Sequence, residues 1–335
     1  MRQALTFDDV ALVPQFNNVP SRTEPNLETW LTRDRKIGIP LIASNMDTVI
    51  GNDLARVLLK NGSCPLYHRF SSEEDQLKWV EEYGEKSFIS CGVGDVERTH
   101  RLLEAGAAGV CIDVAHGHSD RIFDLIEQLK RSFPSKDVIA GNVCTPMAYH
   151  DLVNAGADAV KVGVGPGAAC TTRLVTGFGV PQFTAIQECA EIAEKLRIPL
   201  IADGGIRSSR DVVLALAAGA SSVMIGKLFA LTEESPAMKR DSKQTPHHRE
   251  ARYRGQASEH FQNDFYGALK DKTVAEGVDF WAPVSGPAQA LIDQLLGGIR
   301  SGMTYGGARS IKELQRKAEF VQVTGNYMAE SLTRP

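Results

Sequence analysis

One cysteine of this chain lies in a segment suited to presenting a nucleophile. Cys170 stands in a glycine-rich stretch, residues 163–172, that directly follows the apolar segment 158–162. Three glycines and a proline in five positions are incompatible with a helix or a strand, so the stretch forms a loop whose backbone can approach a ligand closely. The neighbouring threonine hydroxyls and the cation of Arg173 favour the thiolate, which is the form of cysteine that attacks carbon.

Cysteine is more often a small buried apolar residue than a nucleophile, and the other five cysteines fit that description. They lie mostly in apolar, strand-like segments, with no C-x-x-C pair and no histidine spacing suited to zinc. We therefore expect reduced thiols rather than disulfides or metal ligands. The five are Cys64, Cys91, Cys111, Cys144 and Cys189.

Length and composition limit the class of protein. With 335 residues, of which 43% are hydrophobic, the chain can bury the core of one barrel-sized domain or of two smaller ones. No apolar run approaches the roughly 18 residues that span a bilayer, and the N-terminal residues lack the apolar core of a signal peptide. We expect a cytoplasmic protein without membrane contact. The net charge of −4 gives no general attraction to nucleic acid, so an anionic ligand must be held by local groups.

One sequence pattern occurs three times: the end of a helix, an Ala-Gly-Ala turn and an apolar strand. It occupies residues 104–113, 154–162 and 217–225. The glycines of the turns, Gly106, Gly156 and Gly219, fit the left-handed C-cap of a helix that turns directly into a parallel strand. They lie 50 and 63 residues apart, a spacing typical of two βα units.

Further apolar runs, at 40–44, 63–67, 87–91, 138–141 and 199–202, are each followed by a helical pattern. Together with the repeats they make eight strands that alternate with helices. Their near-continuous Val, Ile and Ala content indicates strands covered on both faces. We predict an α/β fold, a closed parallel (β/α)8 barrel of the TIM type. An open doubly wound sheet fits less well, because no G-x-G-x-x-G opens a helix early in the chain.

In such a barrel the carboxyl ends of the strands converge on one site. Asp203, Gly204 and Gly205 follow the seventh strand and Gly226 follows the eighth, where barrels of this type hold a phosphate on backbone N–H groups. The remaining strand ends give 45–47, His68, Arg69, 92–94, Asp113, Ala115, His116, Asn142, the Cys170 loop and Lys227.

After the eighth strand, from Ser235 to about Val284, the chain is polar and shows little periodicity. A stretch that long without regular structure indicates a lid, so we predict an active-site flap at 235–285 within one domain that covers 1–335. Its cations either attract a phosphorylated ligand or form an ordinary solvated loop, and the pattern leaves both open. They are Lys239, Arg240, Lys243, Arg249, Arg252 and Arg254.

The cysteine loop carries a family resemblance. The string GPGAACTTR (165–173), followed by TGFGVPQ (176–182), resembles the catalytic cysteine loop of the IMP dehydrogenase and GMP reductase family. The resemblance extends from the LTFDDV string at 5–10 to Val323, essentially the whole chain. It implies a purine nucleotide substrate (GMP or IMP), a nicotinamide cofactor and a homotetramer.

Several features resemble the reductase members of the family more than the dehydrogenases. Only one helix fits between 68–70 and the third strand, so the accessory (CBS) regulatory domain common in the dehydrogenases is expected to be absent. A dehydrogenase hydrolyses its covalent intermediate, and its family pattern supplies an Arg-Tyr pair upstream of Glu-Gly to activate water. Here the pair before Glu276 and Gly277 is Phe265 and Tyr266, and phenylalanine cannot act as a base. The resemblance thus implies NADPH-dependent reductive deamination of GMP.

The resemblance also implies individual roles. Cys170 is the nucleophile, and Thr172 and Glu276 handle the proton of the departing amine. Asp113 and Arg69 form a polar pair, either beside the nicotinamide or as a salt bridge between strand ends. Nucleotide contacts fall on Asp203, Gly204, Gly205, Gly226, Lys227, Gly255, Gln256, Ala257 and Gly277. Cofactor contacts fall on Ser21, Arg22, Arg69, Asp113, Val114, Ala115, Val164, Gly165, Ser301, Thr304 and Tyr305, some of them reached from a neighbouring subunit. The carbonyls of Gly165, Gly167 and Cys170 suit a hard cation such as K⁺.

Departures from the family pattern keep alternatives open. Gln256 stands where methionine is common and Lys227 where a small residue is usual, so base specificity is less firmly implied than the cysteine chemistry. One alternative is an IMP dehydrogenase without the accessory domain, which uses NAD and water. Another is a catalytically silent barrel that senses purine nucleotides. A flavin enzyme on a similar barrel would leave Cys170 without a role.

Overall fold

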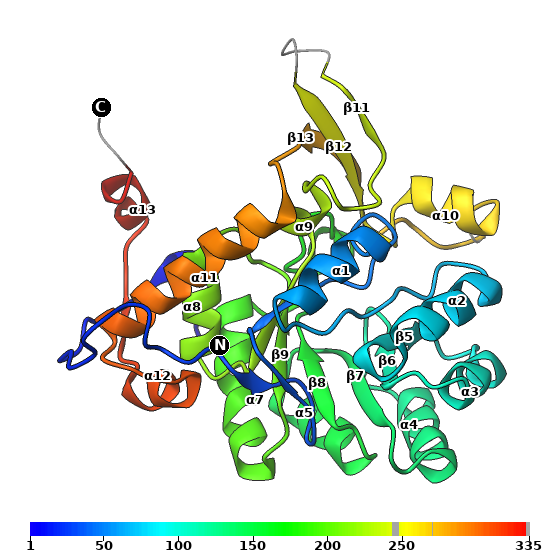
Figure 1. The fold of residues 1–335 in the computed structure, drawn as a ribbon, viewed down its shortest axis with the longest axis horizontal. Coiled ribbons are helices and arrows are strands. Elements are labelled where there is room, and N and C mark those ends of the chain that lie inside the picture. Colours follow the sequence, from blue (N-terminus) through cyan, green and yellow to red (C-terminus); the bar gives the residue numbers. More distant parts are fainter. Residues whose placement is uncertain (243–247, 270, 333–335) are drawn as a thin grey trace.

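A computed structural model describes residues 1–242, 248–269 and 271–332 of the chain. Its centre is a parallel sheet of seven strands in the order β4-β10-β9-β8-β7-β6-β5, covered on its outer face by helices (Figure 1). The strands are β4 (Leu41–Ala43), β5 (Phe88–Cys91), β6 (Gly109–Asp113), β7 (Asp137–Val143), β8 (Ala159–Val162), β9 (Leu200–Asp203) and β10 (Ser222–Ile225). Each corresponds to a strand predicted from the sequence.

The one remaining predicted strand, at 63–67, is reduced to a single bridge. Leu66 pairs in parallel with Phe88 of β5, and the Ser63 hydroxyl donates at 2.6 Å to a carbonyl of β4. The segment therefore lies between the two edge strands of the sheet. Pro65 has no N–H to donate, which is one reason why no regular ladder forms here. The predicted parallel α/β barrel architecture is confirmed, with this one position incomplete.

The helices follow the strands in the predicted alternation. The Ala-Gly-Ala turns adopt the predicted backbone, with φ of +115°, +113° and +115° at Gly106, Gly156 and Gly219. Side-chain caps mark several helix starts, for example Thr145, whose hydroxyl accepts the Ala148 N–H just before Pro146 at the first helical position. The covering helices are α1 (Asn52–Lys60), α2 (Glu73–Tyr83), α3 (Val96–Glu104), α4 (Asp120–Ser132), α5 (Pro146–Asn154), α7 (Gln182–Leu196) and α8 (Ser209–Ala217), while α6 (Thr172–Thr176) and α9 (Lys227–Ala230) are short.

A long C-terminal helix, α11 (Ala288–Tyr305), packs against α8. A Cβ atom on Gly298 would lie 2.3 Å from the Ser209 Cβ, and one on Gly302 would lie 2.8 Å from a Val213 methyl. These two glycines therefore allow the close approach of the helices. Helices α12 (Ile311–Lys317) and α13 (Asn326–Glu330) complete the chain.

Apolar side chains fill both sides of the curled sheet. One buried cluster lies between strands and helices, and a second includes Ile42, Phe88, Cys111, Ile139 and Met224. Covering on both faces explains why the strands are apolar at almost every position rather than at every second one. A lysine, Lys161 on β8, is buried among these strands with 1% of its surface exposed.

The predicted flap contains regular structure, so the prediction of a long irregular stretch is wrong. Strands β11 (Lys239–Asp241), β12 (Arg249–Arg254) and β13 (Asp279–Pro283) form an antiparallel sheet that projects from the barrel, and α10 (Glu259–Tyr266) lies beside it (Figure 1). Cross-strand ion pairs stabilise the sheet, among them Arg240 with Glu250 and Arg252 with Asp279. Several flap cations are thereby engaged within the protein. Lys243 lies outside the described residues.

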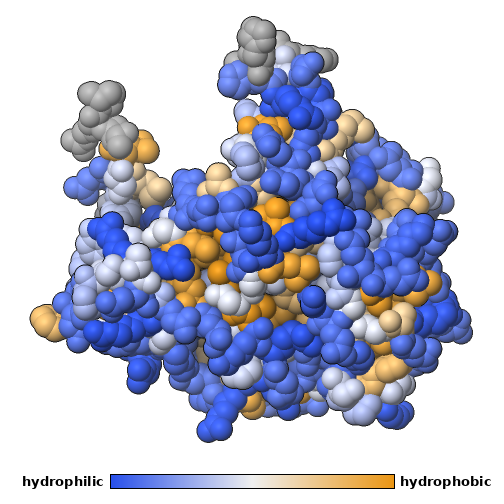
Figure 2. Space-filling model, in the orientation of Figure 1, coloured by the Kyte–Doolittle hydropathy of each residue, from blue (hydrophilic) through white to orange (hydrophobic). Residues whose placement is uncertain are grey.

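Two small antiparallel sheets lie outside the central sheet, and one of them joins an N-terminal strand to a C-terminal one. Strand β1 (Val10–Leu12) pairs with β14 (Phe320–Gln322), and β2 (Thr29–Trp30) pairs with β3 (Lys36–Ile37). Figure 2 shows hydrophilic residues over most of the face in view, with apolar residues gathered near its centre. Among the described residues, no helix combines the length and the apolar character needed to cross a bilayer.

Candidate active site

A cleft of about 800 Å³ opens at the carboxyl ends of the barrel strands, between the strand ends and the flap. Its volume is in the range of ligand-binding pockets. Most of the residues predicted from the sequence line it together. They are Arg69, Asp113, Val114, Ala115, Val164, Gly165, Gly167, Cys170, Thr172, Asp203, Gly204, Gly205, Gly226, Lys227, Gly255, Gln256, Ala257 and Glu276.

Cys170 lies at the wall of this cleft with its side chain half-buried. The thiol donates to Thr172 Oγ1 at 3.2 Å. Its loop leaves β8 through Gly163, where φ is +153° and a Cβ atom would lie 2.0 Å from the Asp203 carbonyl oxygen, so only glycine fits. Arg173 donates to the carbonyls of Val164 and Val180 at 3.1 and 2.6 Å. Arg173 therefore fixes the shape of the loop that carries Cys170.

The cysteine loop and the flap are joined through their backbones. Cys170 and Gly277 form an antiparallel bridge, in which the Val278 N–H donates to the Ala169 carbonyl at 2.9 Å. The Thr171 N–H donates to the Glu276 carbonyl, also at 2.9 Å. This pairing brings the glutamate predicted as a proton carrier next to the predicted nucleophile.

Glycines form one end of the cleft. Gly204 and Gly205 have φ of +92° and +82°, and a Cβ atom on Gly226 would lie 2.5 Å from the Tyr253 hydroxyl oxygen. The backbone is thus exposed where a side chain would obstruct it. Tyr253 is buried and lines the same end. An anionic group fits here, because glycine backbone, the Tyr253 hydroxyl and the cation of Lys227 line the cleft.

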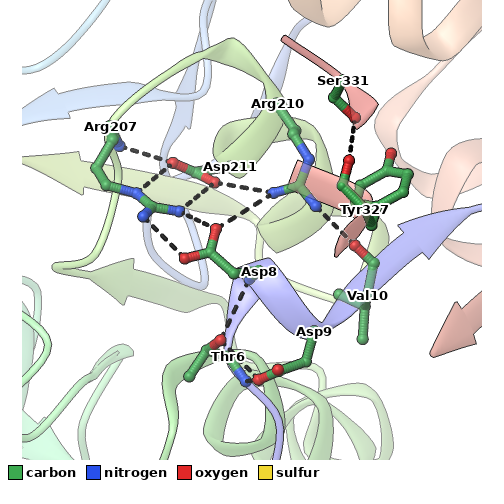
Figure 3. A network of polar contacts seen from close by, with 9 residues as sticks. All are labelled: Thr6, Asp8, Asp9, Val10, Arg207, Arg210, Asp211, Tyr327 and Ser331. Atoms are coloured by element: carbon green, nitrogen blue, oxygen red, sulfur yellow. Dashed lines mark hydrogen bonds and ion pairs between the residues drawn. The ribbon is translucent and has the colours of Figure 1, made fainter. Parts of the chain in front are cut away.

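The loop that carries Gly204 and Gly205 is held in place by ion pairs. Arg207, two residues beyond Gly205, forms ion pairs with Asp8 near the N-terminus and with Asp211 on α8 (Figure 3). Arg210 donates to the Val10 carbonyl at 2.7 Å in the same network. The Arg207 guanidinium lowers the pKa of the Asp8 carboxyl. This network secures the turn after β9 against the N-terminal segment.

The predicted pairing of Arg69 with Asp113 is wrong. The Asp113 carboxylate instead accepts from the ammonium of Lys161 at 3.2 Å, and the same ammonium lies 3.2 Å from Asp203. Asn142 donates to Asp203 at 2.9 Å. Lys161 reaches Asp113 because it projects from β8 into the barrel, whereas Arg69 projects from the segment after the incomplete strand.

Arg69 lies over the ring of Phe70, with its guanidinium carbon 4.2 Å from the ring centroid. Its Nε atom is buried and has no hydrogen-bond partner in the described part of the chain. A buried donor without an acceptor costs free energy unless a ligand satisfies it. Arg69 itself lines the cleft, so its guanidinium can donate to a ligand there.

Some predicted residues lie away from the cleft. Gly277 is adjacent to it through the bridge with Cys170 but does not line it. Arg22 lies over the ring of Tyr305, 6.0 Å from its centroid, at the end of α11. The predicted cofactor contacts outside the cleft are Ser21, Arg22, Ser301, Thr304 and Tyr305. A contribution from a neighbouring subunit stays a prediction for them.

The cysteine prediction is confirmed in one respect: all six cysteines are free thiols. Burial raises the pKa of the Cys64, Cys91 and Cys111 thiols to about 12, which makes them unreactive.

For the predicted K⁺ site, the Gly167 carbonyl accepts the Cys170 N–H at 3.0 Å. Backbone carbonyls suit a hard cation, and the site stays a prediction.

Sequence reasoning overlooked Lys161 and Tyr253. Lys161 is the charged residue in an otherwise apolar strand, which was a usable signal because a buried charge needs a partner. Tyr253 and Ala251 lie on the same face of β12, and both are buried, whereas the residues between and beside them are not. Short alternating strands in a charged segment gave too weak a pattern to reveal it.

The fold and the cleft define an α/β barrel protein whose candidate active site lies at the carboxyl ends of its strands and carries an accessible cysteine. Residues 4–333 of the chain match the protein family described as the IMP dehydrogenase / GMP reductase domain. The chain belongs to this family of oxidoreductases of purine nucleotide metabolism, as the sequence resemblance predicted.

Relatives of both activities are similar to the chain. Inosine-5'-monophosphate dehydrogenase of Borreliella burgdorferi is 37% identical over 98% of this chain and 96% of the relative. The enzyme of the same name from Aquifex aeolicus is 49% identical over 70% of this chain, which spans 49% of that relative. A crystal structure of a GMP reductase variant from Trypanosoma brucei, in complex with guanosine 5'-monophosphate, superposes with a TM-score of 0.92 at 28% identity, over 100% of this chain and 98% of that one.

Proposed function

We propose that the protein is a GMP reductase, which converts GMP and NADPH to IMP and ammonia in purine nucleotide salvage. The observation that carries the proposal is the environment of Phe265. This residue stands where the dehydrogenase pattern supplies the arginine that activates water. Its ring lies 5.3 Å from that of Phe70 and 5.7 Å from that of Phe261, which it stacks upon. An aromatic cluster at this position holds α10 on the barrel and offers no base for hydrolysis.

The reaction uses the cysteine and its neighbours. The Cys170 thiolate forms a bond to C2 of the purine, and the bond between C2 and the amino group breaks. Thr172 and Glu276 transfer the proton with which ammonia departs, a role that suits a hydroxyl and a carboxylate close to Cys170. When bound, the nicotinamide supplies the hydride that replaces sulfur at C2, and IMP is the product.

The cleft supplies binding groups for both ligands. The phosphate lies at Gly204, Gly205 and Gly226, and Asp203 accepts from the ribose hydroxyls. Lys227 and the segment Gly255 to Ala257 contact the nucleotide, and Gln256 reads the base. The Arg69 guanidinium donates to an acceptor on the cofactor, beside Asp113, Val114 and Ala115, which line the cleft with it. A homotetramer completes the cofactor site, with Ser21, Arg22, Ser301, Thr304 and Tyr305 contributed across an interface.

The second candidate is IMP dehydrogenase. Relatives with that name reach 49% identity, and Tyr266, which matches the tyrosine of the water-activating pair, lines the cleft. Its reaction would use the same covalent bond to Cys170, with NAD as hydride acceptor and water as the second reactant.

Two assays separate the candidates. Pure protein is incubated with GMP and NADPH, and separately with IMP and NAD, while the nicotinamide absorbance is followed. Consumption of NADPH with GMP, together with release of ammonia, supports the reductase. Turnover only in the assay with IMP and NAD overturns the reductase proposal. Binding of GMP without turnover in either direction would instead support a nucleotide sensor.

A further inference from the structure

The ammonium of Lys161 joins two sides of the cleft that the proposed function assigns to different ligands. It lies 3.2 Å from Oδ1 of Asp113 and 3.2 Å from Oδ2 of Asp203. Its third short contact is to the sulfur of Met224 at 3.9 Å. All three N–H donors of the ammonium are therefore directed to partners within the barrel.

Burial makes this cation dependent on both carboxylates. The Lys161 side chain is 1% exposed, while the side chains of Asp113 and Asp203 are 16% and 18% exposed. Burial alone would lower the pKa of Lys161, but the neighbouring Asp203 and Asp113 carboxylates raise it above its ordinary value. The lysine stays charged, and each aspartate shares one cation with the other.

The hydrogen bonds also orient the carboxylates. In the described part of the chain, side-chain donors reach Oδ1 of Asp113 and Oδ2 of Asp203, the latter also from Asn142 at 2.9 Å. The second oxygen of each carboxylate is left for a ligand in the cleft, which both residues line.

We propose that Lys161 is a positioning residue that couples the nucleotide carboxylate Asp203 to the cofactor-side carboxylate Asp113. It neutralises their mutual repulsion and fixes the oxygen that each presents. Without Lys161, two carboxylates face one another in a half-buried wall of the cleft. The charge of Asp113 then controls how well the nucleotide binds at Asp203. This inference rests on the proposed binding of a purine nucleotide at Asp203, but not on the direction of the reaction.

The groups around the triad define a useful pH window. Cys111 faces Lys161, Tyr253 faces Asp203, and His68 lies near Asp113. Burial raises the pKa of the Cys111 thiol to about 12 and raises that of the Tyr253 hydroxyl, whereas it lowers the pKa of His68 to about 4. All three stay neutral between about pH 5.5 and 8.5. The GMP phosphate takes up a proton at about pH 6 whichever protein binds it, so a difference in pH dependence between a variant and the wild type reports on the carboxylates.

The test measures GMP binding by calorimetry with the full chain and no cofactor. Lys161→Met is expected to weaken binding by about 10- to 100-fold at pH 8. Affinity should recover partly toward pH 5.5, because one carboxylate can then take up a proton and relieve the repulsion. Lys161→Arg, which keeps the charge, should restore most of the affinity and the pH profile of the wild type. Lys161→Gln, which keeps hydrogen-bonding capacity without charge, replaces Lys161→Met if that variant does not fold.

The decisive variant adds Asp113→Asn to Lys161→Met. It removes the second negative charge, so GMP affinity should rise toward the wild-type value although Asp113 is assigned to the cofactor. If the double variant binds GMP as weakly as Lys161→Met does at every pH, the coupling is disproved and Lys161 is only a core residue. The same titrations with IMP give the same pattern if the enzyme is a dehydrogenase, so failure of the proposed reaction and failure of this inference are distinguishable.

Discussion

Arg254, at the end of β12, forms an ion pair with Asp47, which follows β4, and so ties the flap to the barrel beside the cleft. Its Nε and Nη2 atoms lie 2.9 and 2.5 Å from one carboxylate oxygen of Asp47. Its remaining nitrogen reaches Asp264 of α10 at 2.6 Å, and its guanidinium lies over the ring of Phe261. One side chain thus fixes β12 and α10 to the barrel, immediately before the segment Gly255 to Ala257 that lines the cleft.

Loss of this contact should loosen the flap. Arg254→Gln is expected to lower kcat about 10- to 100-fold, because the flap residues that complete the site lose their anchor. Arg252→Gln is the matched control, since Arg252 pairs with Asp279 inside the flap sheet. The measurements are steady-state kinetics and limited proteolysis of the flap. Equal kinetics and equal cleavage for the two variants would contradict an anchoring role for Arg254.

Removal of the nucleophile should separate chemistry from binding. Cys170→Ala is expected to lower turnover by about 10⁴-fold or more, while GMP binding changes little, because the thiol forms its bond only during the reaction. Cys144→Ala is the control, since Cys144 is also half-buried but does not line the cleft. Mass spectrometry of wild-type protein quenched during turnover should detect a nucleotide adduct on Cys170. Substantial turnover by Cys170→Ala would refute the covalent route.

The strand ends were predictable because topology alone brings them together. In a parallel barrel, residues that follow different strands meet at one rim, so Asp113, Asp203 and Gly226 could be assigned to one cleft from the sequence. The individual partners could not. Which cation reaches Asp113 depends on side-chain direction inside the barrel, and Lys161 reaches it from β8 although Arg69 matched the family pattern.

The flap shows why local patterns fail there. Its strands are short, and their stability comes from pairs between distant residues, such as Arg252 with Asp279 and Arg254 with Asp47. Such pairs leave no periodic apolar signal, so the segment resembled an irregular loop. The Ala-Gly-Ala turns, by contrast, are local, and their glycine conformations were predicted correctly.

A methyl group in the glycine end of the cleft should weaken nucleotide binding. At Gly226 a Cβ atom would lie 2.5 Å from the Tyr253 hydroxyl oxygen and 3.4 Å from that of Ser44. Gly226→Ala must displace Tyr253, so we expect about 10- to 100-fold weaker GMP binding by calorimetry.

The control for this variant is Gly297→Ala. Gly297 lies in α11, and nothing lies within 4 Å of its added Cβ atom. This change should leave GMP binding unchanged and raise the free energy of unfolding by about 0.5–1 kcal/mol, since alanine favours the helix. Unchanged GMP affinity in Gly226→Ala would place the phosphate elsewhere.

Stability should depend on pH through His68, which lies at the rim of the barrel with 7% of its surface exposed. Burial lowers the pKa of this imidazole to about 4, and its Nδ1 atom has no hydrogen-bond partner among the described residues. The unfolded chain takes up a proton near pH 6.5, whereas the folded chain does so only near pH 4. Folding stability is therefore lost as the pH falls from about 6.5 to 4, by about 2 kcal/mol at pH 5.

His68→Gln removes this titration, so its unfolding free energy should fall about 2 kcal/mol less than that of the wild type between about pH 7.5 and pH 5. Urea unfolding at the two pH values measures the difference. His248→Gln removes an exposed imidazole from the flap and is the matched control, expected to lose as much stability as the wild type. Equal losses in all three proteins would show that the His68 imidazole takes up its proton while the barrel stays folded, and would require a hydrogen-bond partner for Nδ1 that forms at low pH.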